Sequence, residues 1–387
     1  MSSGVGEVQS RFLEIATQDA PLKLRRGGVL NSATLAYETY GVLNNAKDNA
    51  ILVFHALSGS QHAAGFNVEV PGLGGRWTED CQVGWWDKFI GPGRALDTSR
   101  YFVVCANFLG SCYGSTGPAS VDPLSGRPYG SAFPWITLAD IVDSQVQLLD
   151  HLGIQRLHAV VGTSLGGMAA ISFATRYPQR VGIVMPIGSG LMVTSLQRIH
   201  NFEQICAIEF DTDFCGGDYY GTDGPQKGLA LARMIGHKTF VSLETIEVRA
   251  RKMLNREYDF GQYELTHQIE SYMLHQGRKF VRRFDANTYL CLMGVWQSID
   301  LLADAAVSSF GELFEPCRSQ RFMVFSIDSD VCFFPEEQSF MVKELRAAKV
   351  PVRYVTVHSQ KGHDSFLTEA ELFVPHLSHA LEEDWWG

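Results

Sequence analysis

The sequence contains no uninterrupted apolar run of about 18 to 20 residues, the length that a membrane-spanning helix needs. Its opening residues, MSSGVGEVQSRFLEI, lack the apolar core of a secretory signal peptide. The eight cysteines include no C-x-x-C pair, which argues against a zinc ribbon or a thioredoxin-like redox site. We therefore expect reduced thiols and a cytoplasmic protein with no membrane partner.

Positive charge is also scarce. The chain has 32 Lys and Arg against 42 Asp and Glu, a formal net charge of −10. Because nucleic-acid binding needs a basic face, no nucleic-acid partner is expected. The sequence has no H-E-x-x-H motif and its histidines are scattered, so no metal site is predicted. Hydrophobic residues at 45% and charged residues at 19% are typical of a globular protein.

Short apolar runs alternate with helical patterns along much of the chain. The runs, typical of buried strands, lie at 50–57, 101–110, 157–164, 180–189, 321–330 and 352–359, and helical spacing is clear at 136–154, 165–178 and 335–348. This alternation predicts an α/β fold, a mostly parallel sheet with helices on both faces. Between these runs, the stretch 191–314 shows long helical windows only. We expect a core formed by 1–190 and 315–387 and a helical cap, or lid, formed by 191–314.

The pentapeptide GTSLG at 162–166 lies between a predicted strand and a predicted helix. This is the G-x-S-x-G context of a nucleophile elbow, in which a sharp turn lifts the serine above the sheet. We therefore predict Ser164 to be a catalytic nucleophile. The alternative is a glycine-rich turn that packs a helix on a strand.

A serine hydroxyl needs a general base, and in this arrangement an acid and a histidine follow the serine in chain order. Asp328 and Asp330 follow one late strand, and His358 and His363 follow the last one. We prefer His363 because His358 still lies in the predicted strand, and Asp330 because it is nearer the loop. The alternatives are a helix cap for the aspartate and a surface position for the histidine.

Acyl transfer also needs two backbone N–H groups that stabilise the oxyanion. The residue after the nucleophile, Leu165, supplies one in the predicted elbow, and Leu57, in the loop after an early strand, is the expected second donor. In the same loop His55 and His62 are expected to serve packing.

Seven segments of the sequence together resemble the homoserine O-acetyltransferases, which have the α/β-hydrolase fold. They are FHALSGSQHAAG, GWWDKFIGPGRALDTSRYFVVCANFLGSCYGSTGPASVDPLSGRPYG, FPWITLADIV, VVGTSLGGMAA, RFDANTYL, DSDVCFFPEEQ and GHDSFL. The resemblance extends over about 22–377. The long second segment is far more specific than G-x-S-x-G.

The resemblance implies the same triad of Ser164, Asp330 and His363. It further implies that Arg233 binds the homoserine carboxylate, which a guanidinium can hold through paired hydrogen bonds. Asp364 would hold the substrate ammonium. The alternatives are a surface arginine and a helix-capping aspartate.

The implied reaction transfers the acetyl group of acetyl-CoA to the hydroxyl of L-homoserine, in methionine biosynthesis, through an acyl-Ser164 intermediate. Acetyl-CoA would be a cosubstrate, with no permanently bound cofactor, and the family implies a homodimer. Phe240 and Ile205 stand where many members have a tyrosine and an arginine. Homoserine or serine O-succinyltransfer, or a plain esterase or thioesterase, therefore stay as alternatives.

The segment GRKFVRRF places Arg278 with Arg282, and Lys279 with Arg283, at i,i+4 helical spacing. An anionic partner is one interpretation of these cations. A solvated helix face or ion pairs within the cap is the interpretation that we prefer.

Overall fold

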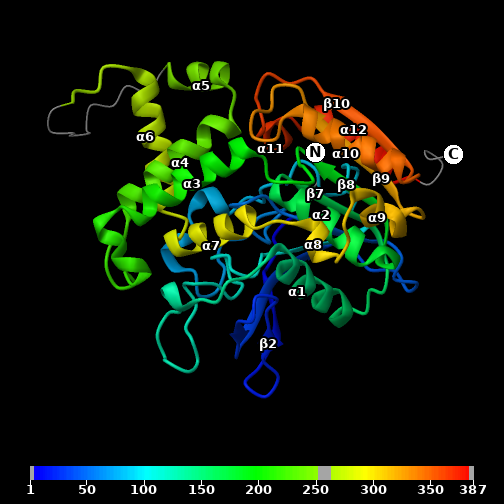
Figure 1. Cartoon of the computed structure of the whole chain (residues 1–387), viewed down its shortest axis with the longest axis horizontal. Helices are drawn as coiled ribbons and strands as arrows, with labels where there is room; N and C mark the ends of the chain where they lie inside the picture. Colours follow the sequence, from blue (N-terminus) through cyan, green and yellow to red (C-terminus); the bar gives the residue numbers. More distant parts are fainter. Residues whose placement is uncertain (1–3, 252–262, 383–387) are drawn as a thin grey trace.

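The computed structural model describes residues 4–251 and 263–382. An eight-stranded sheet organises the fold, in the order β1-β4-β6-β5-β7-β8-β9-β10 (Figure 1). The strands are β1 Arg11–Ala16, β4 Ala33–Tyr40, β5 Ala50–Phe54, β6 Phe102–Ala106, β7 Leu157–Thr163, β8 Val181–Ile187, β9 Arg321–Ile327 and β10 Val352–Val357. The six strands from β6 to β10 in this order run parallel, whereas β1 and β4 pair antiparallel at one edge. A small hairpin, β2 Leu22–Lys23 and β3 Val29–Leu30, lies outside the sheet.

Alternate residues of the parallel strands enter two separate hydrophobic cores. In β5, Leu52 and Phe54 enter one core, and Ile51 and Val53 enter the other. Helices α1 Leu138–His151, α2 Leu165–Arg176 and α10 Pro335–Ala347 cover the first face, and α12 Ala370–Ala380 covers the second. Burial of both faces explains why these strands are continuous apolar runs.

Among its described residues, the segment between β8 and β9 contains helices joined by turns and loops, and no strand. Its helices are α3 Ser195–Glu209, α4 Gln226–Phe240, α5 Leu243–Ala250, α6 Gln268–Val281, α7 Ala286–Gln297, α8 Leu301–Asp304 and α9 Phe310–Phe314. Helix α4 packs against α3 and α6, and the three lie together on the side away from β10 and α12 (Figure 1). The division of the chain into a core and a cap at 190/191 and 314/315 stays a prediction.

All six predicted strands form, and the predicted helices form as α1, α2 and α10. Strands β1 and β4 had no counterpart in the prediction. The last strand ends at Val357, so His358 lies outside it. None of the helices in the described part of the chain combines the length and the apolar character that crossing a bilayer demands.

Candidate active site

Ser164 lies at the sharp turn between β7 and α2. Its backbone angles, φ 56° and ψ −124°, fall in a region that non-glycine residues rarely adopt. A strained backbone of this kind costs about 1–3 kcal/mol and persists only where the surrounding structure enforces it. Here the N–H of Ser164 donates to the carbonyl of Ile187 in β8 at 2.9 Å, which fixes the turn against the neighbouring strand.

The two glycines of the pentapeptide are required by close backbone contacts. A Cβ on Gly162 would lie 2.0 Å from the carbonyl oxygen of Gly166. A Cβ on Gly166 would lie 2.3 Å from the carbonyl oxygen of Phe54 in β5. The G-x-S-x-G spacing therefore reflects a turn too tight for any side chain at these two positions.

His363 and Asp330 form a buried pair at the carboxyl ends of the parallel strands. Nδ1 of His363 lies 2.6 Å from one oxygen of Asp330, and the two side chains are 3% and 0% exposed. The other oxygen of Asp330 accepts the backbone N–H groups of Cys332 and Phe333 at 2.7 and 2.9 Å. These two bonds fix the carboxylate, and the carboxylate fixes the imidazole.

Nε2 of His363 is buried and has no hydrogen-bond partner among the residues that the structure describes. Burial alone would lower the pKa of this histidine, but the charge and hydrogen bond of Asp330 outweigh it, so the pKa lies above its ordinary value. Nε2 is therefore available to take a proton, and Asp330 stabilises the imidazolium that results.

The other candidate residues, Asp328 and His358, pair with each other at 2.8 Å. Their side chains are 42% and 83% exposed, so this pair lies at the surface. The structure thus separates the four residues into one buried and one exposed Asp–His pair. The buried pair, Asp330 with His363, is the one preferred from the sequence.

Leu57 and Leu165 lie where two backbone donors are expected. Leu165 is the first residue of α2, where N–H groups have no intrahelical acceptor and the helix dipole favours negative charge. Leu57 lies in the loop after β5, in the wall of the cavity that Ser164 also lines. Their role as an oxyanion hole stays a prediction.

The two histidines of the β5 loop have structural contacts. His55 stacks on Phe108, its Nε2 accepts the N–H of Phe108 at 3.1 Å, and burial lowers its pKa to about 4. His62 contacts the carboxylate of Glu38 through Nδ1 at 2.8 Å and the carbonyl of Gln82 through Nε2 at 3.0 Å. Both ring nitrogens of His62 thus lie against oxygen acceptors. This buried ion pair ties the β5 loop to β4.

Ser164 and His363 line a cavity of about 370 Å³. Its other lining residues include Leu57, Ser58, Ser60, Trp85 and Tyr113 from the sheet side and Arg233, Phe240, Gln276, Lys279, Phe280 and Arg283 from α4, α6 and the turn after α6. The cavity lies at the carboxyl ends of the strands beside β5, where the strand order reverses because β6 and β7 lie on opposite sides of β5. Ligands of open α/β sheets bind at such a position.

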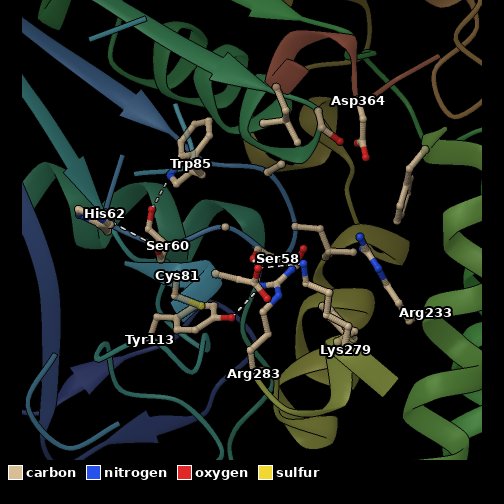
Figure 2. Close-up of a pocket in the computed structure, with 18 of the residues that line it drawn as sticks. Ser58, Ser60, His62, Cys81, Trp85, Tyr113, Arg233, Lys279, Arg283 and Asp364 are labelled. Carbon is tan, nitrogen blue, oxygen red and sulfur yellow. Dashed lines mark hydrogen bonds and ion pairs between the residues drawn. The ribbon is translucent and has the colours of Figure 1, made fainter. Parts of the chain in front are cut away.

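Arg233 and Asp364 both line this cavity, as the resemblance implies for an amino-acid site (Figure 2). Asp364 follows His363 directly, and its N–H donates to the carbonyl of Phe240 at 2.8 Å. Burial, with repulsion from Asp330, raises the pKa of Asp364, and burial together with the Arg283 charge lowers the pKa of Arg233. Phe240 also lines the cavity, 5.3 Å from the Arg233 guanidinium, whereas Ile205 packs against the hydrophobic core.

Two cations of the GRKFVRRF segment, Lys279 and Arg283, also line the cavity. The preferred interpretation of the segment was a solvated face or ion pairs within the cap. The side chain of Lys279 is 44% exposed, but its ammonium lies 2.9 Å from Asp80, a residue outside the predicted cap. Arg283 instead donates to the carbonyl of Ser58 at 3.3 Å and to the Tyr113 hydroxyl at 2.8 Å. The i,i+4 spacing was the signal that could have assigned these two residues to one face.

The chain was compared with known proteins. A family model described as alpha/beta hydrolase fold matches residues 50–370. The homoserine O-acetyltransferase of Moorella thermoacetica is 43% identical over 383 residues, which is 98% of each chain. A homoserine O-succinyltransferase of Laribacter hongkongensis is 42% identical over 390 residues, covering 99% of this chain and 98% of its own.

Two solved structures superpose equally well, each with a TM-score of 0.86 and 25% identity over 97% of this chain. One is esterase E22, of which 100% is covered, and the other is the homoserine O-acetyltransferase of Bacillus anthracis, of which 98% is covered. The same fold therefore accompanies both hydrolysis and acyl transfer among the similar structures.

Proposed function

The chain belongs to the α/β-hydrolase fold family and, within it, to the homoserine O-acyltransferases, and from this we propose that it transfers the acetyl group of acetyl-CoA to the hydroxyl of L-homoserine. The protein is an acyltransferase. The proposal assigns Ser164, His363 and Asp330 as nucleophile, base and acid, and the N–H groups of Leu57 and Leu165 as the oxyanion hole.

In the first half-reaction, Nε2 of His363 takes the proton of the Ser164 hydroxyl while the serine oxygen attacks the thioester carbonyl. The carbonyl oxygen becomes an oxyanion and receives hydrogen bonds from the two backbone donors. When the intermediate collapses, the C–S bond breaks and the imidazolium returns its proton to the leaving thiolate. Free coenzyme A and acetyl-Ser164 result.

In the second half-reaction, Arg233 binds the carboxylate of L-homoserine and Asp364 binds its ammonium group. His363 removes the proton of the homoserine hydroxyl, which attacks the acetyl carbon of the ester. The C–O bond to Ser164 then breaks, and the serine oxygen recovers the proton from His363. Because coenzyme A leaves before the acceptor reacts, the kinetics are ping-pong.

One observation supports an amino-acid acceptor in addition to what the fold implies. The cavity that holds Ser164 and His363 also holds an arginine and an aspartate, Arg233 and Asp364. A zwitterionic amino acid needs one positive and one negative partner, whereas a simple ester needs neither. This pair supports an amino-acid acceptor rather than water.

The same proposal includes a cytoplasmic location, a homodimer and a place in methionine biosynthesis. All eight cysteines are free thiols, which supports a reducing compartment. Three exposed apolar side chains of α3, Leu196, Ile199 and Phe202, support an interface on the cap, because large apolar side chains that gather on a surface commonly mark one.

The test is the release of free thiol from acetyl-CoA and from succinyl-CoA, each with L-homoserine or L-serine. We expect release from acetyl-CoA to depend on L-homoserine and to disappear in the Ser164→Ala variant. Preference for succinyl-CoA or L-serine would retain the mechanism and change the substrates. Release that is independent of any amino acid would indicate a hydrolase and would contradict the roles of Arg233 and Asp364.

A further inference from the structure

The cavity contains more positive charge than a homoserine site requires. The described residues that line it include two arginines and one lysine, Arg233, Arg283 and Lys279, against two aspartates, Asp80 and Asp364. His62 also lines the cavity and is paired with Glu38, which does not. Lys279 is paired with Asp80 at 2.9 Å, and both side chains are about half exposed, so this pair lies near the solvent. Two guanidinium groups and one carboxylate are left in the interior of the cavity.

The two guanidinium groups approach the same aromatic ring. The Cζ atoms of Arg233 and Arg283 lie 4.9 and 5.0 Å from the ring centroid of Phe280. Such contacts stabilise a cation without neutralising it. The proximity of the two charges costs free energy that an anion bound in the cavity would recover.

Homoserine cannot supply a partner for both guanidinium groups. It carries one carboxylate and one ammonium group, which match Arg233 and Asp364. Binding of this zwitterion therefore leaves Arg283 without a counter-ion. The partners of Arg283 in the described part of the chain are neutral, the carbonyl of Ser58 and the hydroxyl of Tyr113, and both are reached through a single nitrogen, Nη1 (Figure 2).

The contacts of Arg283 also place it beside the donor. Ser58 follows Leu57, the proposed oxyanion donor, so the guanidinium lies next to the loop that receives the thioester carbonyl. We propose that Arg283 binds an anionic group of the acyl donor, either the distal carboxylate of a dicarboxylic acyl group or a phosphate of coenzyme A. This inference rests on the proposed function, because it assumes a CoA thioester as the donor.

The test compares three donors with the wild-type protein and the Arg283→Gln variant. They are succinyl-CoA, acetyl-CoA and S-acetyl-N-acetylcysteamine, a thioester without phosphate. Each is assayed for kcat/KM by thiol release at saturating L-homoserine. A charge-assisted hydrogen bond lost from a desolvated site lowers kcat/KM by about ten- to a hundredfold.

A loss of this size for succinyl-CoA relative to acetyl-CoA would assign Arg283 to the acyl carboxylate. A loss for both CoA thioesters relative to the phosphate-free donor would assign it to a phosphate. An equal loss for all three, or no loss, would overturn the proposal and leave Arg283 as an anchor of the Ser58 loop. Arg283→Lys, which keeps the charge, should recover part of the selective loss.

The matched control is Arg282→Gln, at the exposed C-cap of α6. It removes the same charge from the adjacent position and should leave the ratios between the three donors unchanged. If no donor supports homoserine-dependent release by the wild-type protein, the proposed function itself fails. The anion site is then tested with free coenzyme A or succinate as an inhibitor of p-nitrophenyl acetate hydrolysis. Inhibition should be weaker for Arg283→Gln than for the wild-type protein. Equal inhibition of the two proteins would overturn the assignment of Arg283 to an anion site.

Discussion

Replacing Asp330 with asparagine removes the charge of the buried pair and keeps its shape. The backbone N–H groups of Cys332 and Phe333, at 2.7 and 2.9 Å, will hold the amide oxygen, because the amide N–H₂ group cannot accept from them. The N–H₂ group then faces Nδ1 of His363, which lies 2.6 Å from the replaced atom in the wild-type protein. Nδ1 must become an acceptor, so the imidazole proton moves to Nε2.

An imidazole that carries its proton on Nε2 cannot take the proton of Ser164. Asparagine in place of the acid of a Ser-His-Asp triad lowers kcat by about 10⁴. Each factor of ten corresponds to about 1.36 kcal/mol, so the barrier rises by about 5.4 kcal/mol. Asp330 is 1% exposed, which leaves little room for water to restore the original tautomer. We expect this loss in thiol release from acetyl-CoA with L-homoserine.

The chain supplies its own control in the exposed pair. Asp328→Asn removes the same charge two residues away, from the ion pair with His358. Exposed pairs of this kind contribute little, so activity should change by less than about threefold. Thermal unfolding of both variants separates a loss of activity from a loss of folding. If Asp330→Asn retained kcat within tenfold of the wild-type value, the proposed triad would be wrong.

Two further predictions follow from the buried charges. His363 must be neutral to act as a base, and its pKa is raised. The acid limb of the pH profile of kcat/KM should therefore lie above the ordinary pKa of 6.5, with activity lost as the pH falls. A limb below pH 6.5 would argue against His363 as the base. Glu38→Gln removes the buried carboxylate that His62 contacts and should lower the free energy of unfolding by about 3–5 kcal/mol in urea titrations. Although burial opposes it, the bond to His62 lowers the pKa of Glu38, so this stabilisation is present above pH 4.5 and is lost as the pH falls; an unchanged free energy of unfolding at neutral pH would refute the role of the pair.

The strands and the elbow could be predicted from the sequence because their causes are local. Burial on both faces makes each parallel strand an apolar run, and the tight turn at Ser164 requires glycine on either side. Strand β4 was not predicted, because Glu38 interrupts its apolar pattern. That carboxylate is 1% exposed and is compensated by His62, a residue 24 positions away. A distant partner of this kind leaves no local signal.

The limits of the site prediction have a similar origin. Asp328 and Asp330 are two residues apart, and His358 and His363 are five apart. Which aspartate and which histidine are buried depends on where β9 and β10 end. The direction of the α6 cations could not be predicted either. The i,i+4 spacing indicates that Lys279 and Arg283 lie on the same side of the chain. Helix α6 ends at Val281, however, and only its packing on α4 turns that side toward the cavity.

The contact between helix α4 and the loop of His363 bears on how transfer would be favoured over hydrolysis. Asp364 donates its N–H to Phe240 at the end of α4, and the N–H of Ser242 donates to Lys361 at 3.2 Å. These bonds hold the loop of His363 against the helix that carries Arg233. In the proposed mechanism a zwitterionic acceptor bridges Arg233 and Asp364, which would hold its hydroxyl at a fixed distance from the adjacent base. Water has no such pair of contacts, and the advantage of the bound acceptor is one of position. Esterase E22, with a similar fold, shows that the fold alone does not decide between the two outcomes, so the walls of the cavity must.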